Sequence, residues 1–495
     1  MKNIYNSLIA IGIMITFVSC NDELTKEPIG LLTLDQIDAT PTITTLESSV
    51  SSSYQLLAST LNLIGEWNWD GGAVLRNDFI LQDIAANDMN KKWNPDGDQA
   101  WMDELSNFSF TADNGAFNGI WLYDYEGINR INLAISYLTN PDITQAVGIA
   151  DARKSQLLGE AYFLRAFYYF DLVNNFGDVP LLTVPLKSFI EAFDVAIRVP
   201  ATEIWGQINS DLSEAKSLLP DSKYPSPSEP WRASKGAVIA LQAKAALYNE
   251  DWAGVISLVS ELDALGFYSL NANYFDSFDV TKEFSENEVI FAYDHISNQN
   301  PRNGNGLCAL IGWGFIAPSA DFINAFEAND PRLLYTVDVA NQNVSKLLGN
   351  TVGDNKGNDD APSNKIYIRF ADVLLWKAEA LNETGDYDGA IAIINQVRER
   401  ARTTITADGS IVPLGTLADR PSSTDKTQIK GWLMSERRVE LGFESQRFND
   451  LKRWGTAKAV LTGLGRNFQD KNYLYPIPQG EVDKSGGTIT QNAGY

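Results

Sequence analysis

Histidine is almost absent from this chain of 495 residues, since His295 is the only one. A single histidine excludes catalytic centres of the Ser-His-Asp and Cys-His kinds elsewhere in the sequence, and it excludes zinc sites built from several histidines. His295 lies in the run Tyr-Asp-His-Ile at the end of a predicted strand, so we predict a structural role for it. Chemistry based on carboxylates alone stays possible, but 63 Asp and Glu residues give no way to single out one acid and base pair.

Basic residues are scarce compared with acidic ones. The chain has 39 Lys and Arg against 63 Asp and Glu, which gives a formal net charge of −24 and an isoelectric point near 4.5. Binding to a phosphate backbone depends on Lys and Arg side chains that release counterions. The composition therefore excludes nucleic acid as a partner, and it mildly disfavours strongly anionic polysaccharides.

Cysteine is also rare, with only Cys20 and Cys308. A short apolar run precedes Cys20, and the sequence Thr-Phe-Val-Ser-Cys at residues 16–20 is typical of a lipoprotein signal peptide. The run is too short to be a membrane-spanning helix. We therefore predict a signal peptide at residues 1–19, and a lipidated Cys20 that begins a polar tether at residues 20–40. An ordinary signal peptide with an incidental cysteine is the alternative.

Apolar residues recur with helical spacing over much of the remaining chain. The clearest case is residues 151–176, which are apolar on two faces, as expected of a central buried helix. Further helices are predicted at residues 121–138, 201–219, 233–248, 364–382 and 387–401.

Two of the predicted helical hairpins share a pattern. In the hairpin at residues 364–401, small residues end the first helix, an acidic turn at 383–386 follows, and Tyr387 opens the second helix. Gly385 in this turn suits a left-handed helix cap. Residues 246–256 repeat the pattern with one residue fewer in the turn. The repeat resembles tetratricopeptide arrays, although two ordinary hairpins would look similar.

Long stretches between and after these helices are irregular. Residues 266–363 and 403–425 are rich in Gly, Asn, Pro and Asp, with a short strand-like run at 288–293. Long excursions of this kind in a compact protein are usually functional. We predict a single domain at 41–495. Its helical scaffold is predicted at about 41–265 and 364–402, and its loop-rich ligand-facing and C-terminal parts at about 266–363 and 403–495.

Four sequence blocks carry a specific resemblance. They are Phe-Asn-Gly-Ile-Trp to Gly-Ile-Asn-Arg-Ile-Asn at 117–132, Gly-Glu-Ala-Tyr-Phe-Leu-Arg-Ala to Phe-Gly-Asp-Val-Pro at 159–180, Arg-Phe-Ala-Asp-Val-Leu-Leu to Asn-Gln-Val-Arg at 369–398, and Glu-Arg-Arg-Val-Glu-Leu to Arg-Trp-Gly at 436–455. In order and spacing, the blocks resemble the SusD/RagB family of outer-membrane nutrient-binding lipoproteins of Bacteroidetes. The resemblance covers nearly the whole chain.

The resemblance implies a mainly α fold, SusD-like, with a tetratricopeptide-like helical-repeat scaffold, long irregular loops and a few short strands. It also implies a surface-exposed lipoprotein of the cell outer membrane that binds an oligosaccharide or polysaccharide and passes it to a SusC-type TonB-dependent barrel. No catalysis and no cofactor are then expected. Two other functions stay open: a RagB-like protein that binds peptides or proteins through its helical repeats, and a surface glycoside hydrolase.

A cluster of alternating charges marks the fourth block. Its members share one predicted helical region and are Arg437, Arg438, Glu440, Glu444, Arg447, Asp450 and Arg453. We predict that they form ion pairs that hold the C-terminal helices against the repeats. An acid and base centre there would require a cleft and a perturbed carboxylate, and the sequence indicates neither.

Tryptophan is concentrated in two polar stretches near the N-terminus. Residues 66–70 read Glu-Trp-Asn-Trp-Asp, and residues 91–101 read Lys-Lys-Trp-Asn-Pro-Asp-Gly-Asp-Gln-Ala-Trp. Sugar rings pack their C–H faces on aromatic rings while Asn, Asp and Arg bond the hydroxyls, so this composition favours a glycan site. In the family that the chain resembles, such a region forms an aromatic arc with a later loop, here residues 306–318. The predicted ligand-binding residues are Trp67, Trp69, Trp93, Asn94, Asp96, Trp101 and Trp313.

Alternatives remain at these positions. Trp67 and Trp69 could instead attach a loop to the body of the protein. The run Asp-Gly-Asp at 96–98 resembles part of a calcium loop, but regularly spaced oxygen ligands are absent, so we predict no metal. Trp376 lies in an apolar helical stretch and is predicted to belong to the core.

Overall fold

The computed structural model describes residues 40–65, 67–93, 97–186, 191 and 195–495. Helices make up about half of the chain and the strands are few and short, so the predicted mainly α fold is confirmed. The predicted signal peptide, Cys20 and the tether up to residue 39 lie outside the described residues.

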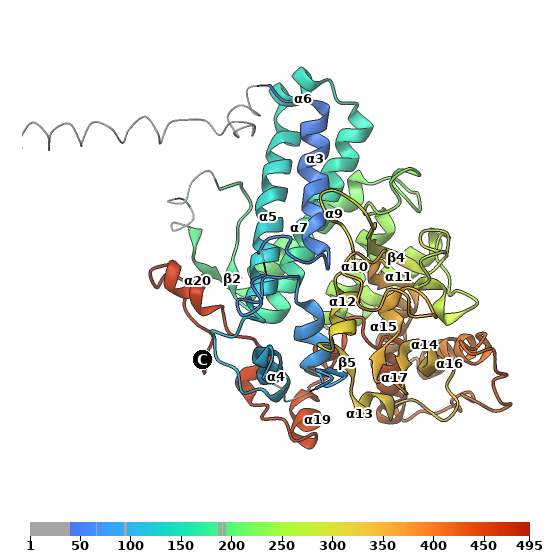
Figure 1. The fold of residues 1–495 in the computed structure, drawn as a ribbon. Coiled ribbons are helices and arrows are strands. Elements are labelled where there is room, and N and C mark those ends of the chain that lie inside the picture. Colours follow the sequence, from blue (N-terminus) through green and yellow to red (C-terminus); the bar gives the residue numbers. More distant parts are fainter. Residues whose placement is uncertain (1–39, 66, 94–96, 187–190, 192–194) are drawn as a thin grey trace, which may run out of the picture.

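Long helices form the first part of the fold. They stand side by side in the upper half of Figure 1 and are α3 (Ile43–Tyr54), α5 (Asn118–Thr139), α7 (Asp151–Phe176) and α9 (Ala201–Leu218). Helix α7 contacts the other three, and the short helix α6 (Pro141–Val147) lies between α5 and α7 in the chain. Apolar residues on both sides of α7 are buried, and Ala166 near its middle is fully buried. The prediction of a central buried helix is therefore confirmed.

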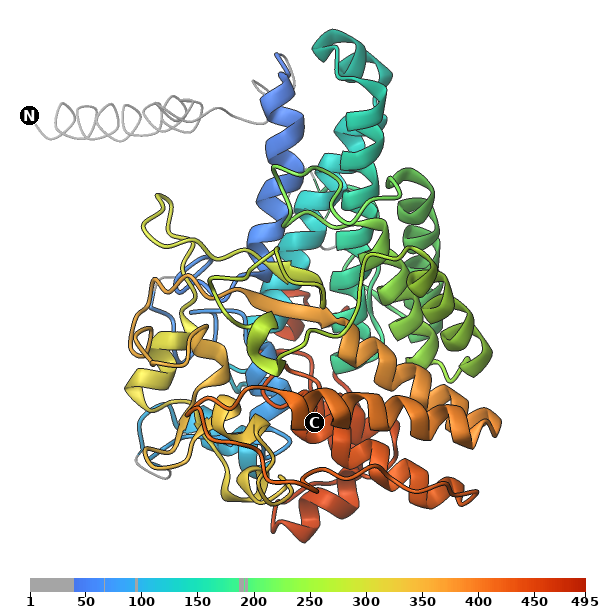
Figure 2. The same cartoon turned by 90° about the vertical axis from the view of Figure 1, so that its right-hand side faces the viewer.

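Two helical hairpins form the second part. Figure 2 shows them at the right, one in green and one in orange, and their bounds are α10 (Lys235–Tyr248), α11 (Trp252–Ala264), α15 (Phe370–Thr384) and α16 (Tyr387–Thr403). Helix α11 packs against α15, so the two hairpins lie next to each other.

The pattern shared by the two hairpins corresponds to a shared backbone geometry. Asp251 and Asp386 cap the second helix of each hairpin, and each carboxylate accepts a hydrogen bond from the glycine N–H three residues later, at 2.9 and 3.0 Å. The left-handed residue of the turn is Glu250 in the first hairpin, with φ 56°, and Gly385 in the second, with φ 91°. The predicted cap at Gly385 is therefore confirmed.

The described strands form antiparallel pairs. The pairs are β1 (Met89–Asn90) with β5 (Ala317–Pro318), β2 (Val179–Pro180) with β3 (Arg198–Val199), β4 (Val289–Tyr293) with β8 (Lys365–Arg369), and β6 (Val337–Asp338) with β7 (Asn343–Val344). Strand β4 confirms the predicted strand. Strand β8 corrects the helix predicted at 364–382, because its Ile-Tyr-Ile core is β-branched and aromatic and pairs with β4. The helix begins only at Phe370.

Further helices lie in the N-terminal region, in the loop-rich region and in the C-terminal part. Their bounds are α4 (Ala100–Asn107), α12 (Leu307–Trp313), α13 (Ala320–Ile323), α14 (Arg332–Thr336), α17 (Lys426–Glu440), α18 (Arg447–Arg453), α19 (Ala457–Gly463) and α20 (Gln479–Lys484). Within the part of the chain that the structure describes, no helix combines the length and apolar character needed to cross a bilayer.

Buried ion pairs attach the C-terminal helices to the rest of the fold. Arg437 of α17 contacts Asp372 of α15 at 2.7 Å and Asp450 of α18 at 2.9 Å. The carboxylate of Glu440 accepts hydrogen bonds from three buried guanidinium groups, those of Arg332, Arg369 and Arg400. The predicted structural network is thus confirmed, except that Arg447 forms no ion pair with any described residue.

Candidate functional site

Three tryptophans have strongly exposed side chains. The exposed fraction is 56% for Trp67, 63% for Trp93 and 42% for Trp313. A large aromatic side chain left in water is unusual unless it serves as a contact surface, so these three positions mark a candidate binding site.

Strand pairing brings Trp93 and Trp313 together. Met89 pairs with Pro318 and Asn90 with Ala317, and the Lys92 N–H extends the pairing by donating to the Gly314 oxygen at 2.9 Å. Trp93 directly follows Lys92 in one segment, and Trp313 directly precedes Gly314 in the other. The two exposed tryptophans are therefore positioned by backbone hydrogen bonds between segments far apart in the sequence.

Gly314 allows Trp93 to lie close to this backbone. Its φ is 86°, in the left-handed region that favours glycine, and it ends helix α12. A Cβ atom at this position would lie 2.9 Å from the indole nitrogen of Trp93. A larger residue at 314 would thus strain the backbone and displace the Trp93 ring.

Trp69 completes the group from a third segment. Its ring lies 6.2 Å from the Trp313 ring at 63°, and 5.6 Å from the Phe315 ring. Gly72 fixes the turn that carries Trp69, because its φ is 67° and a Cβ there would lie 1.6 Å from the Gly115 oxygen. We call Trp69, Trp93, Trp313 and Phe315 the aromatic platform.

Trp67 lies in the same turn as Trp69, whose N–H donates to the Trp67 oxygen at 2.9 Å. The Trp67 N–H in turn donates to the Asn62 side chain at 2.7 Å. Both Trp67 and Trp69 therefore belong to one hydrogen-bonded turn. The Trp67 side chain is exposed, whereas Trp69 is half-buried.

A lysine borders the aromatic platform. The ammonium group of Lys92 lies 5.2 Å from the centre of the Trp93 ring, where cation–π attraction holds the ring in place. The same group donates to the Asn341 oxygen at 2.6 Å and to the Asn343 side chain at 3.3 Å. Asn343 also lines a groove of about 470 Å³ with exposed Val339 and Lys356. Lys92 therefore links the aromatic platform to a neighbouring groove with amide and charged groups.

Several predictions about the site need correction. Trp101 is only 7% exposed, and its indole N–H donates to the Gln99 side chain at 2.8 Å. The polar residues that suggested exposure precede α4, whereas Trp101 lies in the first turn of this helix and packs into the core, so the expected exposure was wrong. The loop predicted at 306–318 contains helix α12, which places Trp313 at a helix end. Asn94 and Asp96 lie outside the described residues.

Two members of the site were missed from the sequence. Phe315 follows Trp313 by two residues in the run Gly-Trp-Gly-Phe, so its presence there could have been noticed. Lys92 precedes Trp93, but its partners at 341 and 343 are far away in the sequence, and no local signal indicates them. Among the described residues no group of three or more His, Cys, Asp or Glu could hold a metal ion.

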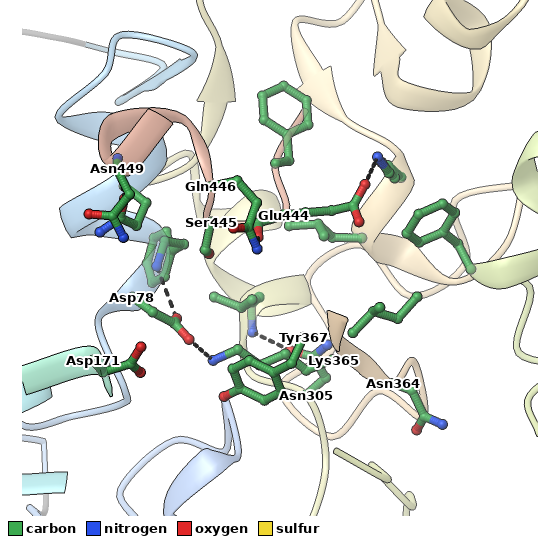
Figure 3. Close-up of a pocket in the computed structure, with 18 of the residues that line it drawn as sticks. Asp78, Asp171, Asn305, Asn364, Lys365, Tyr367, Glu444, Ser445, Gln446 and Asn449 are labelled. Atoms are coloured by element: carbon green, nitrogen blue, oxygen red, sulfur yellow. Dashed lines mark hydrogen bonds and ion pairs between the residues drawn. The ribbon is translucent and has the colours of Figure 1, made fainter. Parts of the chain in front are cut away.

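An internal polar cavity is a different kind of feature. Figure 3 shows Asp78 and Lys365 facing each other in it, and their ion pair is 2.5 Å long. Burial lowers the pKa of Lys365. The cavity volume is about 70 Å³, which accommodates a few water molecules but is far below the roughly 300 Å³ at which ligand pockets begin. We interpret this cavity as hydrated polar interior.

His295 is part of the structure and not of a catalytic centre. It is buried, its Nδ1 lies 2.8 Å from the Asn303 oxygen, and its Nε2 accepts a hydrogen bond from the Ser59 N–H at 3.3 Å. Burial lowers the pKa of His295 to about 3. The ring is thus neutral at pH 7 and joins two loops.

Two stretches of the chain match models of known protein families. Residues 37–247 match the family model described as "Starch-binding associating with outer membrane", and residues 337–495 match the model described as "SusD family". SusD-like protein P2 of Formosa agariphila is 26% identical over 98% of both chains.

Solved structures are also similar. A laminarin-binding SusD-like protein is 25% identical with a TM-score of 0.73, covering 92% of this chain and 100% of that one. Surface glycan-binding protein A from Bacteroides thetaiotaomicron, in complex with laminarihexaose, is 21% identical with a TM-score of 0.71, covering 91% of this chain and 99% of that one.

Proposed function

The chain belongs to the SusD/RagB family, and from this premise we propose that it is a surface lipoprotein that binds an oligosaccharide on the aromatic platform. The observation that carries the proposal is the convergence of Trp69, Trp93 and Trp313 from three separate segments, two of them with strongly exposed rings. Glycan recognition by the named relatives supports the ligand class.

The chemistry of the aromatic platform suits a sugar. The C–H faces of a pyranose ring pack on indole rings, while its hydroxyls exchange hydrogen bonds with amides and charged groups such as Asn350 and Lys356 in the neighbouring groove. The edge-to-face packing of Trp69 on Trp313 holds the rings in place before binding, so little conformational entropy is lost when a ligand binds. The net charge of −24 favours a neutral glycan.

We infer binding without cleavage. The buried carboxylate Glu440 is engaged by guanidinium groups, and His295 is buried and hydrogen-bonded on both ring nitrogens. Neither group is therefore available for proton transfer to a bound glycan. A panel of neutral oligosaccharides, titrated onto the soluble chain from residue 21 onward, tests this directly. We expect saturable binding to at least one glycan with no release of shorter products; progressive shortening of the bound glycan would contradict the proposal.

Delivery to a SusC-type TonB-dependent barrel and anchoring through a lipid on Cys20 complete the proposal. Both rest on the family, since Cys20 lies outside the described residues. Affinity purification of the chain from its native outer membrane should recover a barrel protein in a comparable amount. Cys20→Ala should release the protein from the membrane without loss of helical content. Membrane retention of this variant with a lipid label would contradict the proposed anchor.

A further inference from the structure

A second pocket lies between the end of α3 and the segment that follows β4. Its volume is about 250 Å³, and its walls include Gln55, Trp231, Tyr293, Asp294 and Ile296. None of the residues that line it belongs to the aromatic platform or to the groove beyond Lys92. The pocket is therefore a separate feature of the surface.

Trp231 forms a fixed aromatic wall of this pocket. Its ring meets the Tyr54 ring edge-on at 5.2 Å and 88°, and the Arg232 guanidinium lies 4.5 Å from its centre. The pocket thus has an aromatic surface that is held in place before any ligand arrives. Ile296, which is 45% exposed, adds an aliphatic surface.

Two polar side chains in the pocket have no partner in the part of the chain that the structure describes. The carboxylate of Asp294 is half-buried yet forms neither a hydrogen bond nor an ion pair there, and burial raises its pKa. The side-chain amide of Gln55 is also unbonded among these residues. A half-buried carboxylate without a partner is unfavourable unless a ligand or water satisfies it. The pocket therefore presents an acceptor and an amide to whatever enters it.

The wall made by residues 296–303 is rigid. Ser297 donates to the Asp360 oxygen at 2.7 Å, the Asn298 N–H donates to the Asp360 carboxylate at 2.7 Å, and Arg302 forms a two-pronged pair with Asp359 at 2.9 Å. These bonds fix both sides of the loop tip. A preformed pocket of this kind loses little free energy to reorganisation on binding.

Two chain segments, one that follows α3 and one that follows β4, connect the pocket to the aromatic platform. Ser59 donates to His295, Thr60 donates to the Gly304 oxygen at 3.0 Å, and the Gly306 N–H donates to the Ser59 oxygen at 2.9 Å. Toward the platform, one segment continues to Trp69 and the other to Trp313. The pocket lies along the opposite stretch of the same pair, near Gln55 and Ile296.

We propose that this pocket is a second sugar-binding site, which takes one residue of a neutral glycan. The sugar ring packs on Trp231 and Ile296, its hydroxyls donate to Asp294, and Gln55 exchanges further hydrogen bonds with it. The Asp294 carboxylate disfavours an acidic sugar, and the Arg232 charge beside the Trp231 ring is neutralised by ion pairs with Glu47, Glu160 and Glu229. The volume is just below the roughly 300–1,000 Å³ of pockets for drug-sized ligands, which suits a single ring. The ligand class rests on the proposed function; the position of the site does not.

Site-resolved NMR tests this proposal. The Trp231 indole N–H and the Ile296 methyl group report on the pocket, and the Trp313 indole N–H reports on the platform. The probes are D-glucose, D-galactose, D-mannose and D-xylose at millimolar concentration, and an oligosaccharide that binds the wild-type chain. We use wild type, the double variant Trp93→Ala and Trp313→Ala, and the variant Asp294→Ala. Asp388→Ala, at an exposed aspartate in the first turn of α16, is the matched control.

We expect at least one monosaccharide to shift the Trp231 and Ile296 signals in wild type and equally in the double variant. In Asp294→Ala, the monosaccharide affinity measured from these shifts should be at least tenfold weaker. The oligosaccharide should still shift the Trp313 signal in this variant. If the sugars leave Trp231 and Ile296 unchanged while the oligosaccharide shifts Trp313, the pocket proposal is overturned and the proposed function stands. Pocket shifts that persist unchanged in Asp294→Ala also overturn it. Failure of the proposed function would instead appear as an unchanged Trp313 signal with every glycan.

Discussion

The rings of Trp69 and Trp313 pack edge to face, with 6.2 Å between their centres, although they belong to segments far apart in the chain. Each ring supports the other, so the exposed aromatic surface depends on the tertiary fold and not on one loop. The β1–β5 pairing adds Trp93 to the same surface. A site built in this way is rigid only while the helical scaffold is intact.

Loss of a core tryptophan should affect stability and not binding. Trp376 is fully buried, so Trp376→Ala removes a large apolar side chain and leaves a cavity, at a cost of about 3–5 kcal/mol. The exposed Trp93 is the matched control, and Trp93→Ala should change the free energy of unfolding by less than about 0.5 kcal/mol. Urea unfolding followed by circular dichroism measures both. Equal midpoints for the two variants would contradict the assigned burial.

The buried ion-pair network should be sensitive to the loss of one carboxylate. Burial alone would raise the pKa of Glu440, but the three guanidinium groups around it hold the pKa below its ordinary range. Glu440→Gln leaves buried positive charge without its counterion, which typically costs about 3–5 kcal/mol.

The matched control is Glu261→Gln, since the pair between Lys216 and Glu261 lies partly exposed at the surface. We expect that control to cost less than about 1 kcal/mol. If both variants unfold at the same urea concentration, Glu440 does not hold the C-terminal helices in place.

His295 should make the protein less stable in acid. Its pKa falls from 6.5 to about 3 on burial, so between these values the unfolded chain binds a proton that the folded chain does not. Stability therefore decreases as pH falls below about 6.5, by up to about 1.4 kcal/mol per pH unit. From pH 6.5 to 4.5 this amounts to about 2–3 kcal/mol.

His295→Gln removes this titration and serves as the comparison. Its free energy of unfolding should decrease less than that of wild type over the same pH range, as measured by urea unfolding at several pH values. Parallel losses in wild type and variant would show that His295 is accessible to protons in the folded state.

Regular helices could be predicted from the sequence because their apolar pattern is local. The prediction for residues 151–176 coincides with α7, and Gly385 caps α15 as expected. The start of α15 was misplaced because β8 depends on a partner strand, β4, that lies far away in the chain. Strand pairing of this kind leaves no local periodic signal that separates it from the first turn of a helix.

Part of the candidate site could also be predicted from local sequence context. Polar neighbours correctly indicated exposure of Trp67 and Trp93, and the glycines at 312 and 314 correctly indicated an uncrowded ring at Trp313. The same criterion failed for Trp101, because on a helix the adjacent residues point to other faces and say little about burial. Phe315 and the partners of Lys92 belong to the site only through tertiary contacts, which composition does not reveal.

The most direct test of the aromatic platform is isothermal titration of a cognate oligosaccharide onto wild type, Trp93→Ala and Trp313→Ala. Glycan affinities in the micromolar to millimolar range correspond to about 4–8 kcal/mol, so loss of one aromatic contact of about 1.4 kcal/mol or more weakens binding at least tenfold. Trp432→Ala, on α17 away from the platform, is the control and should bind like wild type. We predict at least tenfold weaker binding for both platform variants with unchanged helical content. Wild-type affinity in both would contradict the assignment of the aromatic platform as the glycan site.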